Sequence, residues 1–191
     1  MKIAFLFLIQ NDINFPEIWN NYFNNNFNKI NIYCHPKNKD NVKTSWLKNN
    51  IIKDLAPTKW GYLTKAIRNL LKTSIKNKEN KQFILISESC IPINTFNNFY
   101  LFCNDFKKSY INFRQFDDIN IKKSFLSKNY FKNIKLIKHS QWFCLSRHHV
   151  KKLLNNKNLP LFDKVLAGDE NILSLISDCN NIINYSVTYV N

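Results

Sequence analysis

The sequence predicts an α/β fold with a mostly parallel central sheet and helices on both of its faces. Two observations support this fold class. Short apolar runs alternate along the chain with segments whose apolar residues recur at helical spacing, and no internal repeat or linker interrupts the alternation. The 191 residues, 45% of them hydrophobic, suffice for one substantial core but not comfortably for two. We therefore expect residues 1–191 to form a single domain.

The first half of the chain shows the clearest elements. Residues 3–9 are an apolar run, which is typical of a strand buried on both faces. Apolar residues at helical spacing predict a helix over 15–27, with a proline tolerated in its first turn. A second strand over 29–35 alternates apolar and polar residues and stops at a His-Pro pair. After a polar loop at 37–43, helical spacing returns over 60–75.

The second half continues the alternation with shorter elements. Apolar or alternating runs predict strands over 83–87, 110–113, 141–145 and 186–190. Apolar residues three or four positions apart predict helices over 94–106, 148–154 and 169–176. The pattern weakens between residues 114 and 138. In sheets built this way, ligands bind outside the carboxyl ends of the strands.

Glycine and cysteine usage excludes several classes of site. The chain has only two glycines, Gly61 and Gly168, so it contains neither a dinucleotide-binding fingerprint nor a P-loop. A nucleotide diphosphate would have to be held by side chains and helix N-termini. The five cysteines include no C-x-x-C pair, which favours buried free thiols over a zinc cluster or a disulfide framework. Because neither a cleavable leader nor a bilayer-spanning segment is recognisable, we expect a cytoplasmic location.

The chain is strongly basic, with 28 Lys+Arg against 13 Asp+Glu and a formal charge of +15. Such a charge suits a nucleic-acid, phosphate or acidic-membrane partner. However, Lys, Asn, Ile and Phe are what AT-rich codons specify, so genomic drift on a solvated surface is a competing explanation. The basic residues are also scattered rather than interleaved with aromatics along one face. We expect no specific nucleic-acid partner, and peripheral association with an acidic membrane surface stays open.

Three polar clusters could carry chemistry. Glu88, Ser89 and Cys90 follow the strand over 83–87, where side chains leave a sheet and become accessible; a plain polar turn is the alternative. The second cluster joins Ser140 and Gln141 to Trp142. Polar groups beside aromatic rings suit a sugar, whose ring faces pack on aromatics and whose hydroxyls need hydrogen bonds. Its alternative is a core strand with the tryptophan inside.

The third cluster, Asp169-Glu170, opens the helix predicted over 169–176. Carboxylates are favoured at a helix start by the free N–H groups and the helix dipole, so simple capping is a strong alternative. Glu170 nonetheless qualifies as a general base.

Taken together and in order, these segments resemble the Core-2/I-branching β-1,6-N-acetylglucosaminyltransferase family, and most closely its plant and microbial members. Seven segments carry the resemblance, and they are residues 2–8, 32–35, 60–61, 87–92, 140–143, 169–170 and 187–190.

The resemblance implies a GT-A-like, Rossmann-related fold and an inverting transfer of a sugar, GlcNAc or a related hexose or pentose, from a UDP-sugar to a glycan hydroxyl. It implies metal independence, no cofactor beyond the UDP-sugar donor, and Glu170 as the catalytic base. The absence of Asp-x-Asp in the sequence agrees with metal independence. The residues expected to bind substrate are Trp60, Glu88, Ser89, Cys90, Ser140, Gln141, Trp142 and Asp169, with His35 and Arg147 binding the nucleotide.

One part of the family pattern has no counterpart in this sequence. The animal enzymes hold the diphosphate with an Arg and a Lys well downstream of the base, whereas only 21 residues follow Glu170 here. The substitute candidates are Arg114, Arg147, His148 and Lys151, each with the alternative of a plain surface residue. Two other functions therefore stay open: a catalytically degenerate sugar-binding protein, and a basic module that binds nucleic acid or acidic glycans.

Overall fold

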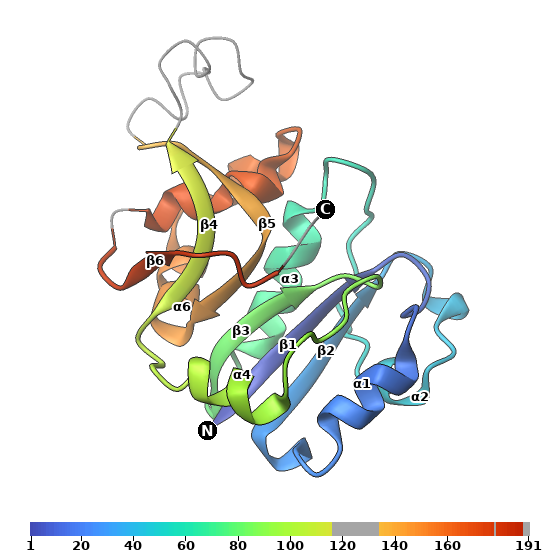
Figure 1. Ribbon diagram of the computed structural model, residues 1–191. Coiled ribbons are helices and arrows are strands. Elements are labelled where there is room, and N and C mark those ends of the chain that lie inside the picture. The colour runs from blue at the N-terminus through green and yellow to red at the C-terminus, as the bar shows by residue number, and fades with distance from the viewer. Residues whose placement is uncertain (116–133, 178, 189–191) are drawn as a thin grey trace.

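One mixed β-sheet organises the computed structural model of the chain, which describes residues 1–115, 134–177 and 179–188 (Figure 1). Within these residues, six strands lie in the order β2-β1-β3-β5-β4-β6. Their bounds are β1 (Lys2–Ile9), β2 (Ile30–Pro36), β3 (Asn80–Ile86), β4 (Ser109–Gln115), β5 (Ile137–Ser146) and β6 (Ile182–Asn184). Only β5 runs antiparallel to its neighbours, so the sheet is mostly parallel and the predicted fold class is confirmed.

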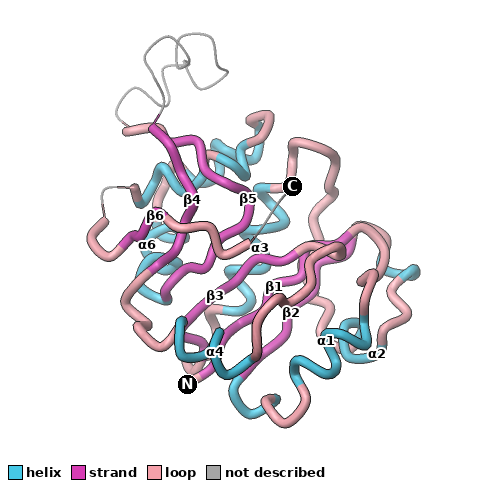
Figure 2. Tube along the Cα trace, in the orientation of Figure 1, coloured by secondary structure: helices cyan, strands magenta, loops and turns pink. Residues whose placement is uncertain are grey.

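Helices cover both faces of the sheet (Figure 2). One face carries α3 (Thr64–Ser74) and α6 (Arg147–Asn155), and the other carries α1 (Pro16–Phe23), α2 (Ser45–Lys48) and α4 (Phe96–Phe102). Successive side chains of a strand point to opposite faces. Leu6 of β1 therefore packs in the core with α3, and its neighbour Phe5 packs in the core with α1. Burial on both faces explains the uninterrupted apolar run at the N-terminus.

Helices α1, α3 and α4 are shorter than their apolar spacing predicts, because capping and turns set their ends, whereas α6 extends one residue beyond its predicted range at each end. Helix α4 begins where the Thr95 hydroxyl accepts a hydrogen bond from the backbone N–H of Asn98, at 3.3 Å. Helix α3 begins only at Thr64, because residues 60–63 form a turn in which Gly61 has a φ of +74°. A 3-10 turn at Lys39–Asn41 interrupts the predicted loop over 37–43. Among the described residues, no helix combines the length and apolar character needed to cross a bilayer.

The helix predicted over 169–176 is wrong. Two short 3-10 helices, Gly168–Glu170 and Ile172–Ile176, occupy the segment and are separated by Asn171 with a φ of −134°. Backbone and hydroxyl groups of the second one bond to β5: the hydroxyl of Ser174 accepts from the Ile137 N–H at 3.0 Å and donates to its carbonyl at 3.3 Å. Tertiary hydrogen bonds thus compete with a regular α-helix, so Glu170 lies in a 3-10 turn.

The strand predicted over 186–190 is also wrong for its described part, since residues 186–188 are irregular. The strand that pairs with β4 lies earlier, at Ile182–Asn184. At its end the Asn184 side chain accepts from the Phe113 N–H and donates to the Phe113 carbonyl, at 3.0 and 2.9 Å. This side chain takes the place of the next ladder pair. Residues 189–190, and most of the weakly patterned stretch after residue 114, lie outside the described residues.

Candidate active site

The carboxyl ends of β1, β2 and β3 meet at one edge of the sheet because these strands are parallel. Strand β5 runs against β3, with Cys144 opposite Ile84, so its earlier residues extend toward that same edge. A cavity of about 380 Å³ lies there. It is lined by Leu8, Ile9, Gln10, Lys37, Thr58, Lys59, Trp60, Leu63, Ser87, Glu88, Gln141 and Trp142. Four of the residues that the sequence predicts to bind substrate, Trp60, Glu88, Gln141 and Trp142, thus line the same cavity.

A bulge in β5 shapes the cavity wall. Phe143 pairs with Ile111 of β4, but the next pair joins His139 to Phe113. The three intervening residues, 140–142, therefore face the single residue 112 of β4. The Ser140 hydroxyl accepts the Trp142 N–H at 3.3 Å within this bulge. Bulges are common beside active sites because they re-aim side chains, and here two of the three bulged residues, Gln141 and Trp142, line the cavity while Ser140 stabilises the bulge.

His139 anchors the bulge from inside the core. Its Nε2 accepts the Leu173 N–H at 3.2 Å, so the ring proton is on Nδ1, which donates to the Ser140 carbonyl at 2.7 Å. Burial lowers the pKa of His139 to about 4. A neutral imidazole thus ties the bulge to the 3-10 helix that follows Asn171.

The turn after β3 presents Glu88 to the cavity. Its Oε2 accepts the Gln10 N–H at 3.3 Å and its carbonyl accepts the Asn14 N–H at 3.0 Å. Ser89 and Cys90 do not line the cavity. The Ser89 hydroxyl lies 3.0 Å from that of Ser87, and the Cys90 side chain packs against the core on the α1 side. The structure therefore brings one of these three predicted residues to the cavity and uses the other two to shape the turn.

Glu170 lies at the same end of the sheet as Glu88 but outside the cavity lining. It forms an ion pair with Lys138, close to the start of β5, and its side chain is 34% exposed. Its neighbour Asp169 is buried, and burial raises the pKa of Asp169 against the opposing effects of nearby backbone N–H groups and of Lys138. Its Oδ1 has no hydrogen-bond partner among the described residues. Lys138 therefore pairs with Glu170 and also acts electrostatically on Asp169.

Two cations that the sequence analysis missed line the cavity. Lys37 directly follows β2, and Lys59 directly precedes Trp60. Both are exposed, and the Lys59 ammonium lies 4.3 Å from the centre of the Tyr62 ring. The position of Lys37 just past a predicted strand was a usable signal, whereas that of Lys59 depends on how its loop folds back. With Glu88 they make the charged lining of the cavity net positive.

The cations proposed from the sequence lie elsewhere. Arg147 donates to the carbonyls of Ile75, Asn77 and Asn80, at the opposite end of β3, where it closes the turn after α3. His148 and Lys151 are exposed on the helix that Arg147 begins. Because this helix starts at the far end of the sheet, none of the three reaches the cavity.

Arg114 and His35 are nearer to the cavity without lining it. Arg114 is exposed and pairs in register with Lys138, at the cavity end of the sheet. His35 is fully buried, and its Nε2 accepts the Ala56 N–H at 2.9 Å, so it holds the loop that leads to Trp60. Burial lowers the pKa of His35, which keeps this acceptor nitrogen unprotonated near neutral pH.

The chemistry available at this edge is therefore that of carboxylates, cations, amides and indole rings. Among the described residues, no three or more His, Cys, Asp or Glu side chains are arranged to hold a metal ion. An aromatic and amide lining suits a sugar ring, and cations suit a phosphate.

A mostly parallel sheet with a polar and aromatic cavity at its carboxyl edge defines a ligand-binding α/β protein. The family model of the Core-2/I-branching enzymes matches residues 3–167, and the chain belongs to this family. It is similar to "Glycosyltransferase BC10" of Oryza sativa subsp. japonica, with 24% identity over 179 residues. That match covers 85% of this chain and 43% of the rice protein, so the chain spans less than half of the relative's length.

Proposed function

We propose that this protein is a glycosyltransferase that moves a sugar from a UDP-sugar to a hydroxyl of a glycan, with inversion and without a metal ion. The observation that carries the proposal is that Trp60, Glu88, Gln141 and Trp142 line one cavity at the carboxyl edge of the sheet. Family membership supports the same class of reaction. GlcNAc, or a related hexose or pentose, is the proposed sugar.

Lys37 and Lys59 are proposed to neutralise the donor diphosphate. An inverting displacement breaks the bond between the anomeric carbon and the diphosphate oxygen, and UDP leaves with the electron pair. The developing negative charge needs cations or oriented donors. Among the described lining residues, these two lysines are the ones with positive charge, and they come from different loops.

Glu170 is proposed to take the proton of the acceptor hydroxyl as its oxygen attacks the anomeric carbon. Its side chain forms an ion pair with Lys138 at the same end of the sheet as the cavity. The pair must open for the proton to be transferred. Glu88 is the carboxylate that lines the cavity itself, and its proposed role is to hold sugar hydroxyls.

The placement of Glu170 outside the cavity lining also favours a second function, that of a degenerate transferase which binds a UDP-sugar without turning it over. One screen separates the two functions. Thermal stability is measured with UDP, UDP-GlcNAc, UDP-glucose, UDP-galactose and UDP-xylose, with and without EDTA, and UDP release is then assayed with glycan acceptors. A ligand that binds only the folded protein adds about 2.7 kcal/mol of stability at a hundred-fold excess over its Kd.

Acceptor-dependent release of UDP from one of these donors would establish the transferase. A thermal shift with no release under any acceptor would favour the degenerate protein. No shift with any nucleotide would overturn both.

A further inference from the structure

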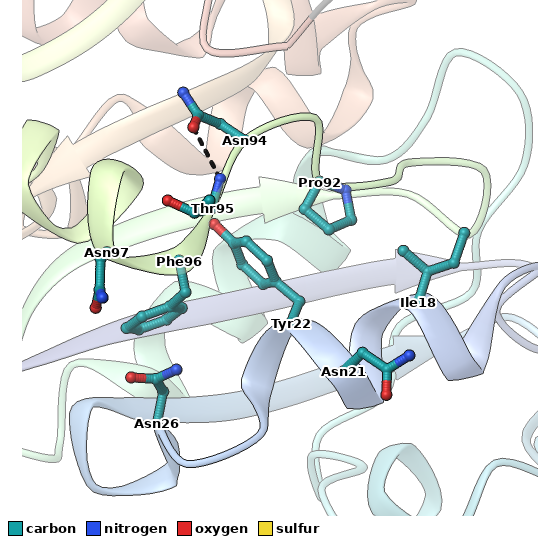
Figure 3. Close-up of a pocket in the computed structure, with 9 residues that line it drawn as sticks. All are labelled: Ile18, Asn21, Tyr22, Asn26, Pro92, Asn94, Thr95, Phe96 and Asn97. Atoms are coloured by element: carbon teal, nitrogen blue, oxygen red, sulfur yellow. Dashed lines mark hydrogen bonds between the residues drawn. The ribbon is translucent and has the colours of Figure 1, made fainter.

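A second cavity, of about 440 Å³, lies between α1 and the segment that leads from β3 into α4 (Figure 3). Helix α1 and the residues after it contribute Ile18, Asn21, Tyr22 and Asn26, and the facing wall consists of residues 92 and 94–97. We call this cavity the α1–α4 groove. It belongs to the α1 side of the sheet, whereas Leu63 and Trp142 of the candidate active site pack with the core on the α3 side.

The lining of the α1–α4 groove is neutral. Four of its nine residues are asparagines, and the others are Ile18, Tyr22, Pro92, Thr95 and Phe96. Asparagine makes up 32 of the 191 residues of the chain, so its share of the lining clearly exceeds the overall composition. The Lys29 ammonium borders the groove: it donates to the Asn26 Oδ1 at 3.4 Å and lies 5.9 Å from the centre of the Phe96 ring. Because this one cation is already bonded and no charged residue belongs to the lining itself, the groove has little selectivity for phosphate or other anions. It fits an uncharged ligand rich in hydrogen-bonding groups.

Several polar groups of the α1–α4 groove have unused hydrogen-bonding capacity. The amides of Asn21 and Asn97 and the hydroxyl of Tyr22 have no hydrogen-bond partner in the described part of the chain. Burial raises the pKa of Tyr22, so its phenol stays protonated and can donate. In Figure 3 the Tyr22 ring extends from α1 toward Thr95, between the two walls. Amides and hydroxyls that both donate and accept match the hydroxyls of a sugar.

The walls of the α1–α4 groove are held in place before any ligand arrives. The Asn94 carbonyl oxygen Oδ1 accepts from the Thr95 N–H at 2.8 Å and from the Asn98 side chain at 2.9 Å. The Trp19 Nε1–H donates to the Cys90 carbonyl at 3.0 Å, which ties α1 to the facing segment. Phe96 is 5% exposed and forms a floor against the Tyr22 ring, with ring centres 5.5 Å apart. Preorganised walls reduce the entropy cost of binding.

We propose that the α1–α4 groove binds a neutral saccharide, and that this saccharide is a remote part of the glycan acceptor. One continuous segment connects the two places: Ser87 and Glu88 line the candidate active site, and residues 92 and 94–97 line the groove. The identity of this saccharide as the acceptor rests on the proposed function, whereas saccharide binding as such rests on the groove alone. The Phe96 floor and the Tyr22 ring can pack against the faces of a sugar, and the amides of Asn21 and Asn97 can form hydrogen bonds with its hydroxyls.

The test is saturation-transfer NMR of the full chain with three neutral probes, cellotetraose, xylotetraose and chitotetraose. The variants are Asn21→Ala combined with Asn97→Ala, and Tyr22→Phe, which removes one hydroxyl and keeps the ring packing. Asn104→Ala, an exposed asparagine beyond α4 and outside the lining, is the matched control. We expect at least one probe to bind the natural protein and the Asn104→Ala variant equally.

We expect the double variant to bind that probe at least about fivefold more weakly, the equivalent of one lost hydrogen bond, and saturating UDP not to displace it. Equal binding by all variants, displacement by UDP, or no binding of any probe would overturn the proposal. The thermal shift with UDP is recorded on the same samples. If it is absent while the saccharide binds in the groove, the proposed transferase fails and the saccharide site stands.

Discussion

Among the predicted site residues, Glu170 shows the largest difference between the environment that the sequence predicts and the one in the structure. Its place after Asp169 predicts a helix start, but the carboxylate lies in a 3-10 turn and is paired with Lys138. Both side chains are about one-third exposed, so solvent screens the pair and its contribution to stability is small. A catalytic and a merely ionic role for this carboxylate therefore predict different outcomes of the same substitution.

We predict that Glu170→Gln lowers turnover by roughly 10²-fold or more, because the amide keeps the shape but accepts no proton. UDP-sugar affinity and melting temperature should change little. Glu88→Gln is the comparison, and its main effect should be on the KM for substrate. Turnover near that of the natural protein in Glu170→Gln would return Glu170 to the role of an ion-pair partner.

The two cavity lysines lead to a prediction about charge. Lys37→Ala combined with Lys59→Ala should weaken UDP binding by roughly tenfold or more, since each removes a charge-assisted contact to phosphate, and should leave uridine binding nearly unchanged. Titration calorimetry with both ligands measures this difference. Lys76→Ala, exposed just after α3, is the control. Equal losses for UDP and uridine would argue against a diphosphate contact.

His139 makes folding stability depend on pH. Burial holds its pKa at about 4 in the folded protein, below the ordinary 6.5, so the unfolded chain binds more protons between these values. The free energy of unfolding should therefore fall as the pH drops from about 6.5 to 4, by on the order of 3 kcal/mol. Urea unfolding at several pH values measures it.

Other groups modify this dependence. The pKa values of His35 and His149 are also lowered by burial and act in the same direction, whereas the raised pKa of Asp169 acts in the opposite one. His139→Gln does not titrate, so its stability should depend less steeply on pH across this window. Identical pH dependence in the variant and the natural protein would show that His139 is not the source.

At the scale of elements, both glycines of the chain lie where the loop before α3 meets the segment before Glu170. The Gly61 carbonyl accepts the Ala167 N–H at 2.7 Å. A Cβ on Gly168 would lie 2.3 Å from the Phe162 carbonyl oxygen and 2.8 Å from the Thr64 hydroxyl. This contact joins the loop that carries Trp60 to the turn that carries Glu170, so close backbone packing positions two parts of the candidate active site.

We predict that Gly168→Ala destabilises the protein by about 1–3 kcal/mol, because the backbone of 162 or 168 must move to admit the methyl group. Binding of UDP should weaken as well, since the loop that carries Lys59 moves with it. Chemical unfolding and calorimetry measure both effects. Lys65→Ala, exposed on α3, should change neither. A melting temperature for Gly168→Ala equal to that of the natural protein would contradict this account of the contact.

At the scale of the whole molecule, the net charge is +15, and the charged lining of the active-site cavity, two lysines and one glutamate, is also net positive. A protein that neutralises a diphosphate with side chains needs no divalent ion. We therefore predict that UDP binding, and turnover if present, survive EDTA unchanged. If EDTA abolished UDP binding and manganese restored it, a metal ion would take part and the prediction would be wrong.

The sequence by itself determined the layers of the fold and the family. Apolar runs and helical spacing are local, so the mostly parallel sheet and its covering helices could be predicted from β1 to β5. The exit of β3 at Ser87 and Glu88 was also predictable, because an apolar run that ends in polar residues marks the edge of a sheet. The polar and aromatic residues around Trp142 were also correctly assigned to a strand, β5, which contributes to the cavity.

Only the tertiary structure decided which side chains share a cavity. The bulge at 140–142 exists because β4 pairs with β5 on either side of it, and the 3-10 turns after Ala167 exist because Ser174 and Leu173 bond to β5. Such choices depend on partners more than 25 residues away in the chain, about which local periodicity carries no information. For the same reason the sequence did not indicate Lys59 as a cavity residue and suggested Arg147 instead, which donates to the Ile75 carbonyl at the end of α3.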